Sequence, residues 1–162
     1  MGLPALCVGC AGALMLAMLA GGCQRPPAAP DYTVTLRGRT WHVELANTSE
    51  LRYRGLSDRP SLDADKGMLF LFPQADIQQF CMRRCLIPLD IAFLDAQRRV
   101  VMTYTMGVEP YGLDRKTYSS QSPAQFALEA PAGSLAKAGV KQGDKADFSP
   151  NIAVPPVEAG TE

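Results

Sequence analysis

The first 23 residues constrain the fold most, because an export signal does not belong to the folded domain. The segment carries no charged side chain, is rich in Ala, Leu and Met, and ends on two glycines before Cys23. A polar, Pro-rich stretch follows from Gln24 to Pro30. An apolar run that closes on small residues and then meets polar chain is typical of an export signal. We therefore predict a lipoprotein signal peptide over residues 1–22 and a lipid anchor on Cys23.

Two other interpretations of this leader stay open, a secretory signal cleaved without lipidation and a retained membrane anchor. No Lys or Arg precedes the apolar run, and Ala20 stands where bacterial lipoproteins usually place Leu. A helix over the leader would be long enough to span about 30 Å of hydrocarbon, although Pro4 and the glycines weaken such a helix. The preferred prediction is an exported, membrane-anchored protein that faces the periplasm or the cell exterior.

The rest of the chain predicts one small domain between two irregular segments. Residues 23–31 form a Pro-rich tether, residues 32–149 a single β-rich domain, and residues 150–162 a flexible tail. This length suffices to bury one core. The 16 basic and 16 acidic residues balance and form no basic stripe. We therefore expect no nucleic acid partner.

Short apolar and β-branched runs separated by turn residues predict a mainly β fold. Residues 32–36 and 40–45 form a predicted hairpin around Gly38, and a short helix follows from Ser49 to Leu56, capped by Asn47. Residues 67–72 are a continuous apolar run that predicts a buried strand. Further strands are predicted at 78–83, 89–95, 98–106, 125–130 and 145–148, a long loop at 107–124, and a second helix at 132–138. The pattern favours an antiparallel sandwich or barrel, a β-rich α+β fold with two short helices.

Five sequence pieces, taken in order, resemble a known family. They are 54–59 (RGLSDR), 67–70 (GMLF), 80–95 (FCMRRCLIPLDIAFLD), 128–133 (LEAPAG) and 140–144 (VKQGD). The string is similar to the domain-of-unknown-function family 192, an uncharacterised conserved family, over about Val34 to Phe148. The resemblance implies a small, mostly β domain, often behind an export signal, and no assigned activity. The chain departs from that pattern at Cys81 and at Arg84-Cys85, where the family usually has an aromatic residue and Asn-Thr.

Three charged residues in these pieces are candidates for a polar site. Asp90 and Glu129 stand within apolar runs, and a buried carboxylate needs a partner or its ionised form is disfavoured. Arg59 is able to supply bidentate pairing. Either these groups hold a ligand, or they form a structural ion pair or turn cap, with Asp90 accepting hydrogen bonds from backbone amides after Pro88.

The two domain cysteines allow several interpretations. On a straight strand the Cα atoms of Cys81 and Cys85 would lie about 13 Å apart, beyond the roughly 7 Å limit for a disulfide. A disulfide therefore requires the chain to bend at Arg83-Arg84. With Met82 they supply soft sulfur that suits Cu(I), while free thiols and core methionines are the simpler interpretation. No cofactor is predicted.

Tyr118 belongs to the loop at 107–124, and long loops on a β scaffold often carry binding function. The chain has one histidine, His42, on the polar side of a predicted strand, so a His-based hydrolase is not predicted. No complete catalytic set is visible.

The preferred functional hypothesis is a binding or accessory module for a small polar or cell-envelope ligand, in a groove with Arg59, Met82, Asp90, Tyr118 and Glu129. One alternative is an envelope-acting enzyme with Asp90 or Glu129 as general acid or base. A second alternative is copper binding through Cys81, Cys85 and Met82.

Overall fold

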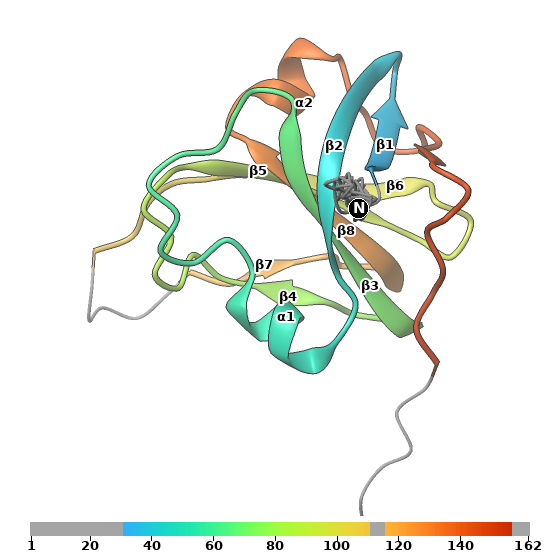
Figure 1. The fold of residues 1–162 in the computed structure, drawn as a ribbon, viewed down its shortest axis with the longest axis horizontal. Coiled ribbons are helices and arrows are strands. Elements are labelled where there is room, and N and C mark those ends of the chain that lie inside the picture. The colour runs from blue at the N-terminus through green and yellow to red at the C-terminus, as the bar shows by residue number, and fades with distance from the viewer. Residues whose placement is uncertain (1–30, 111–115, 157–162) are drawn as a thin grey trace, which may run out of the picture.

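A computed structural model of the chain describes residues 31–110 and 116–156 (Figure 1). The predicted leader, Cys23 and the tether up to Pro30 lie outside these residues. The elements in order are β1 (Tyr32–Leu36), β2 (Arg39–Ala46), α1 (Ser49–Arg54), β3 (Lys66–Asp76), β4 (Gln79–Phe80), β5 (Leu89–Leu94), β6 (Val100–Met106), β7 (Tyr118–Ser119), β8 (Ala124–Pro131), α2 (Ser134–Lys137) and β9 (Asp147–Phe148).

The main sheet is mixed and curls on itself. Its seven strands run in the order β6-β5-β8-β3-β2-β1-β9, and β4 and β7 form a separate two-stranded ribbon. Near the two edges, Arg99 pairs with Lys145, and the Val100 amide donates to the Asp144 carbonyl over 2.8 Å. These bonds join the sheet's ends into a half-barrel. The predicted fold class, mainly β with two short helices, is confirmed.

The curled sheet has an apolar cluster on each face, because successive side chains of a strand point to opposite sides. On β3, Leu69 and Leu71 belong to one cluster, while Met68 and Phe70 belong to the other. The cluster with Leu69 also contains Trp41 and Leu135 of α2. The α1–β4–β7 side, at the bottom of Figure 1, covers the Phe70 cluster. The second face positions the candidate site described below.

The predicted hairpin at the start of the domain is confirmed. Tyr32 lies opposite Val43, and the turn passes through Arg37 and Gly38, both with positive φ. The predicted helix is present as α1, but its cap differs from the prediction. The side chain of Thr48, rather than Asn47, accepts a 3.2 Å hydrogen bond from the Leu51 amide.

The sheet is not purely antiparallel, because β2 and β3 pair in parallel. The segment between them carries α1 and the loop up to Asp65, and this connection returns the chain to the same end of the sheet. The alternation of apolar residues along a strand does not show whether that strand pairs with its neighbour in parallel or antiparallel. All other paired strands of the sheet are antiparallel.

Three further segments differ from the predicted boundaries. The strand predicted at 78–83 is limited to β4, because a turn follows in which the Cys85 amide donates to the Met82 carbonyl over 3.2 Å. The predicted loop at 107–124 contains the short strand β7, and residues 111–115 lie outside the described residues. Beyond the predicted domain end, Ile152 is buried in the core.

Candidate functional site

A pocket of about 500 Å³ opens on the face of the sheet that α1 covers. Its walls come from α1 and the turn after it, from β3 and β4, and from the loop that follows β4. One residue of β8 completes it. The lining residues are Arg52, Tyr53, Arg54, Gly55, Leu56, Ser57, Phe70, Phe72, Gln78, Gln79, Phe80, Cys81, Arg83, Cys85 and Glu129.

Glu129 of β8 is the buried acid of this pocket. It follows the alternation of its strand, so it lies on the same face as Ala127 while Leu128 packs into the opposite cluster. The backbone of β8 also approaches β3 closely here, since a Cβ at Gly67 would stand 2.6 Å from the Glu129 carbonyl oxygen. Glycine at position 67 thus allows the approach that holds Glu129 in place.

The environment of Glu129 keeps its carboxyl neutral. The residue is 5% exposed, and burial raises its pKa from 4.5 to about 8. Among residues 31–110 and 116–156, no hydrogen bond or ion pair engages this carboxyl. At neutral pH, Glu129 therefore presents a protonated carboxyl, a hydrogen-bond donor with acceptor capacity left over, to the pocket.

Phenylalanine rings form the apolar wall beside this carboxyl. Phe80 of β4 contacts Phe70 edge-to-face, with ring centroids 4.9 Å apart, and Phe72 at 6.4 Å. The same Phe80 ring also contacts Phe93 of β5 at 5.4 Å. These perpendicular contacts hold the rings in fixed orientations. The pocket therefore offers a rigid aromatic wall to the apolar part of a ligand.

Three arginines give the pocket a cationic rim. Arg52 donates to the Leu71 carbonyl over 3.1 Å, and its guanidinium lies 5.5 Å from the centroid of the Phe72 ring. Arg83 donates to the Tyr53 carbonyl and lies 3.8 Å from the Tyr53 ring centroid. Arg54 at the end of α1 is exposed. No second acid lines the pocket among the described residues, so its field favours anionic groups.

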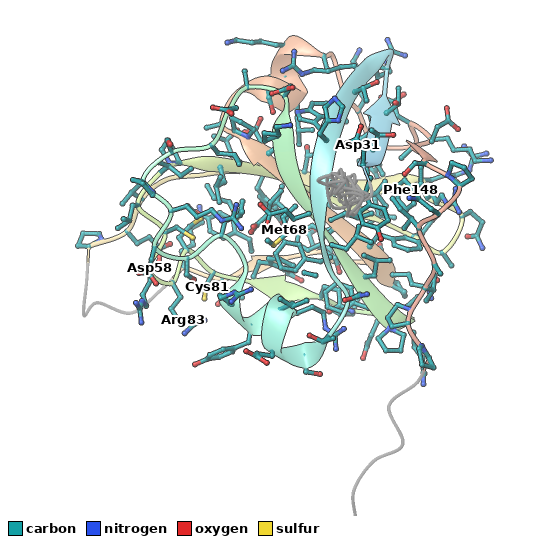
Figure 2. The ribbon with its side chains drawn as sticks, viewed as in Figure 1. Asp31, Asp58, Met68, Cys81, Arg83 and Phe148 are labelled. Atoms are coloured by element: carbon teal, nitrogen blue, oxygen red, sulfur yellow. The ribbon has the colours of Figure 1, made fainter. Side chains whose placement is uncertain are left out.

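The loop after β4 holds both cysteines and is fastened to the turn after α1. Figure 2 shows Cys81 and Arg83 near Asp58. The Ser57 hydroxyl donates to the Arg83 carbonyl over 2.9 Å, and the Asp58 amide donates to the Arg84 carbonyl over 2.7 Å. Arg84 also forms an ion pair with Asp58 at 2.6 Å. Cys81 and Cys85 are free thiols, the first exposed and the second buried.

Asp90 lies on the opposite face of the sheet from Glu129. It is 1% exposed and accepts two hydrogen bonds, from the Thr105 hydroxyl at 2.7 Å and from the Leu135 amide at 2.9 Å. The second bond ties β5 to the first turn of α2. The structure thus gives Asp90 partners of its own, and the backbone amide among them belongs to Leu135 rather than to the residues after Pro88.

Arg59 pairs with neither of the two candidate acids. Its guanidinium makes a bidentate ion pair with Glu44 of β2, at 2.5 and 2.6 Å. This pairing lowers the pKa of Glu44, mainly through the hydrogen bonds from Arg59. The pair lines a second hollow of about 410 Å³, which also contains His42 and Asp63. His42 pairs there with Asp31 at 2.7 Å.

Met82 and Tyr118 both lie in the core beneath the first pocket and do not line it. Met82 is 2% exposed, and Tyr118 is 4% exposed with its ring 5.4 Å from that of Tyr104. Burial raises the pKa of Tyr118. Of the five residues expected in one groove, only Glu129 lines the pocket. The two cysteines, which were considered separately, line it as well.

Sequence reasoning missed the pocket's walls. Phe72, Phe80 and the arginines of α1 were not singled out, although Phe70, Phe72 and Phe80 are a visible excess of aromatic residues near the predicted buried strand. No side-chain cluster of three or more His, Cys, Asp or Glu residues that could hold a metal ion occurs within the described ranges. Within the same ranges, no helix is long and apolar enough to cross a membrane.

These features define a class of protein: a small half-barrel domain with one aromatic pocket built around a buried acid. The chain belongs to the family DUF192, described as an uncharacterised ACR, whose sequence profile matches residues 32–148. The resemblance inferred from the sequence is therefore confirmed.

Similar proteins come from archaea and bacteria. A Thermococcus gammatolerans protein named UPF0127 protein is 31% identical over 115 residues, covering 67% of this chain and 68% of that protein. A crystal structure of a Novosphingobium aromaticivorans protein of unknown function superposes with a TM-score of 0.65 at 33% identity, covering 85% of this chain and 99% of that one. A Sinorhizobium meliloti protein, named as a candidate transcription regulator, gives a TM-score of 0.66 at 28% identity, covering 74% and 94%.

Proposed function

We propose that the domain is a binding module for a small ligand with an aromatic or apolar body and an anionic group. The ligand occupies the pocket around Glu129, and the domain is held outside the cytosol by a lipid on Cys23. The observation that carries the proposal is a carboxyl, 5% exposed, that lines the pocket and lacks a partner among the described residues. A ligand group that accepts a hydrogen bond from this protonated carboxyl would satisfy it inside the pocket.

The walls define the ligand's chemistry. The phenyl rings favour an apolar, preferably flat body, while the arginines favour negative charge at the mouth. A volume of about 500 Å³ suits a small molecule. An anionic group, such as a carboxylate or sulfonate, is able both to accept a hydrogen bond from the protonated Glu129 carboxyl and to interact with the arginines of the rim.

The arrangement favours binding over acid–base catalysis. An enzyme with two catalytic carboxyls requires both to converge on one cleft, whereas Asp90 bonds to Thr105 and Leu135 on the other face. Glu129 is left as a single acid, and a binding role needs no second one. The copper alternative gains less support, because Met82 is not among the residues that line the pocket with the two cysteines.

Binding of an aromatic anion tests this proposal. We expect 1-anilinonaphthalene-8-sulfonate to bind saturably at one site at pH 7, detected by its fluorescence. Arg54→Glu reverses the charge of an exposed rim residue and is expected to weaken binding about tenfold, equivalent to about 1.4 kcal/mol. Lys137→Glu makes the same change on α2, outside the pocket, and is expected to change affinity less than about twofold.

Equal losses in the two variants would assign the effect to net charge and contradict the pocket as the site. Unsaturable binding by the wild-type protein would contradict it as well. Near-ultraviolet circular dichroism of each variant verifies that the fold is intact, because this dye also binds partly unfolded chains.

The tether is tested separately, in the organism that makes the protein. We expect the full chain to partition into the detergent phase and to lose its leader before Cys23, with acyl chains on the new terminus detected by mass spectrometry. Cys23→Ala is expected to abolish both acylation and cleavage of the leader, so the variant keeps residues 1–22 and gains no acyl chain. A retained leader, or a processed terminus without acyl chains, would contradict the lipid tether.

A further inference from the structure

The pocket wall carries two thiols that the binding proposal does not use. Cys81 and Cys85 both line the pocket, and Cys81 lies near enough to contribute to the raised pKa of Cys85. Cys81 is exposed and Cys85 is 8% exposed. One thiol is therefore open to solvent and the other is buried, and both belong to the wall of the same cavity.

The backbone between the cysteines bends instead of running as a straight strand. The Cys85 amide donates to the Met82 carbonyl over 3.2 Å, which closes a four-residue turn from Met82 to Cys85. Arg84 lies in the left-handed region at φ 56°, which reverses the chain direction at the end of this turn. The two cysteines therefore do not lie on a straight strand, on which their Cα atoms would stand about 13 Å apart.

Residues of the turn after α1 hold this loop through its backbone, and no short hydrogen bond engages the sulfur atoms of the two cysteines within the described residues. Ser57 and Asp58 bond its backbone at Arg83 and Arg84. The Cys85 thiol makes only a 3.8 Å contact with the Arg83 carbonyl. The turn thus stays anchored through its carbonyls, while the two thiols remain available for chemistry with each other.

We propose that Cys81 and Cys85 form a reversible dithiol–disulfide pair on the pocket wall. The exposed Cys81 thiolate attacks an external disulfide, R–S–S–R, forms a mixed disulfide and releases one RSH. Cys85 then loses its proton and attacks the Cys81 sulfur, which displaces the second RSH. The balanced change is two protein thiols plus one external disulfide giving one internal disulfide plus two external thiols, with two electrons passing to the external disulfide. The source of the oxidant rests on the export proposed above, because compartments outside the cytosol are oxidising.

Asymmetry between the thiols sets the order of these steps. Burial raises the pKa of Cys85 to about 11, so Cys85 reacts slowly as the first nucleophile. Exposed Cys81 meets the oxidant first. Once Cys81 carries a mixed disulfide, the proximity of Cys85 makes the second step intramolecular, which compensates for its low thiolate fraction.

Peptide mapping of the full-length protein extracted from membranes tests this pair. The native protein is equilibrated with mixtures of reduced and oxidised glutathione, quenched with acid, alkylated and cleaved with trypsin. Cleavage after Lys66, Arg83, Arg84 and Arg98 separates the cysteines into peptides 67–83 and 85–98. We expect the oxidised protein to yield these two peptides joined by one disulfide, at least tenfold above the glutathione adduct of Cys81, and to release them on reduction.

Variants assign the order of events. Cys85→Ser is expected to trap the glutathione adduct on Cys81, and Cys81→Ser is expected to leave Cys85 largely unmodified over the same time. The proposal is overturned if wild-type protein accumulates the Cys81 adduct while Cys85 stays open to alkylation, or if urea-denatured protein forms the linked peptides as readily as native protein. Neither result bears on ligand binding, which the dye experiment tests in fully reduced protein.

Discussion

Replacing Glu129 with glutamine is expected to remove most of the pH dependence of folding stability between pH 4.5 and about 8. In the wild-type domain, burial raises the pKa of Glu129 from 4.5 to about 8. Within this interval the folded state binds one more proton than the unfolded state, so the free energy of unfolding falls as pH rises. The full interval corresponds to at most about 5 kcal/mol.

The direction of the effect follows from the desolvation of the charged form. Below pH 4.5 the acid is neutral in both states and contributes no penalty, whereas above pH 8 the folded domain must bury an unpaired carboxylate. Glutamine is nearly isosteric and never ionises. Glu129→Gln is therefore expected to match the wild type near pH 4 and to be more stable by several kcal/mol at pH 9.

Urea unfolding from pH 4 to pH 9, followed by circular dichroism, measures both curves. Cys85 contributes only near pH 9, because burial raises its pKa from 9.0 to about 11, and this contribution is the same in wild type and variant. Parallel curves for wild type and variant would show that Glu129 ionises normally. That result would remove the neutral donor from the proposed binding site.

Removing the Asp90 carboxyl is expected to destabilise the domain by about 3 kcal/mol at pH 7. Asp90→Ala leaves the Leu135 amide and the Thr105 hydroxyl without their acceptor, and the site is 1% exposed. It also removes the hydrogen bond that ties the first turn of α2 to β5. Dye binding by the folded variant is expected to stay within about twofold of the wild type, because the residue lies outside the pocket.

A conservative replacement separates hydrogen bonding from charge at this position. Asp90→Asn retains an acceptor for the Leu135 amide and a donor that the Thr105 oxygen is able to accept, so we expect a loss of about 1 kcal/mol. Denaturant midpoints and slopes of the three proteins give the comparison. An Asp90→Ala variant that is stable but has lost dye binding would move Asp90 into the functional site.

Local sequence patterns were sufficient for much of the fold. The turn residues between two β-rich runs predicted the β1–β2 hairpin, and the apolar run at 67–72 predicted the buried part of β3. The parallel β2–β3 pairing was not predictable in this way, because it depends on where the α1 connection crosses. The strand expected at 78–83 ended early because the Met82–Cys85 turn has no strong Gly or Pro signal.

The candidate site was predictable only in part, for a related reason. An acid inside an apolar run identified Asp90 and Glu129 as buried, yet the two are separated by sheet alternation and register. Ile91, the neighbour of Asp90, pairs with Glu129 across β5 and β8, so the two acids point to opposite faces. Arg59 found its partner in Glu44, which is 15 residues away and on a neighbouring element. Such pairings follow from tertiary packing rather than from local composition.

The central claim is that the Glu129 carboxyl is neutral and faces a ligand-binding pocket. Carbon-13 NMR of the side-chain carboxyl, assigned by comparison with Glu129→Gln, measures its titration directly in the folded domain. The account predicts a pKa of about 8 in the free protein and a higher value with 1-anilinonaphthalene-8-sulfonate bound, because binding and protonation favour each other reciprocally. A Glu129 carboxyl that titrates near 4.5, with a pKa that the dye does not change, would contradict this claim.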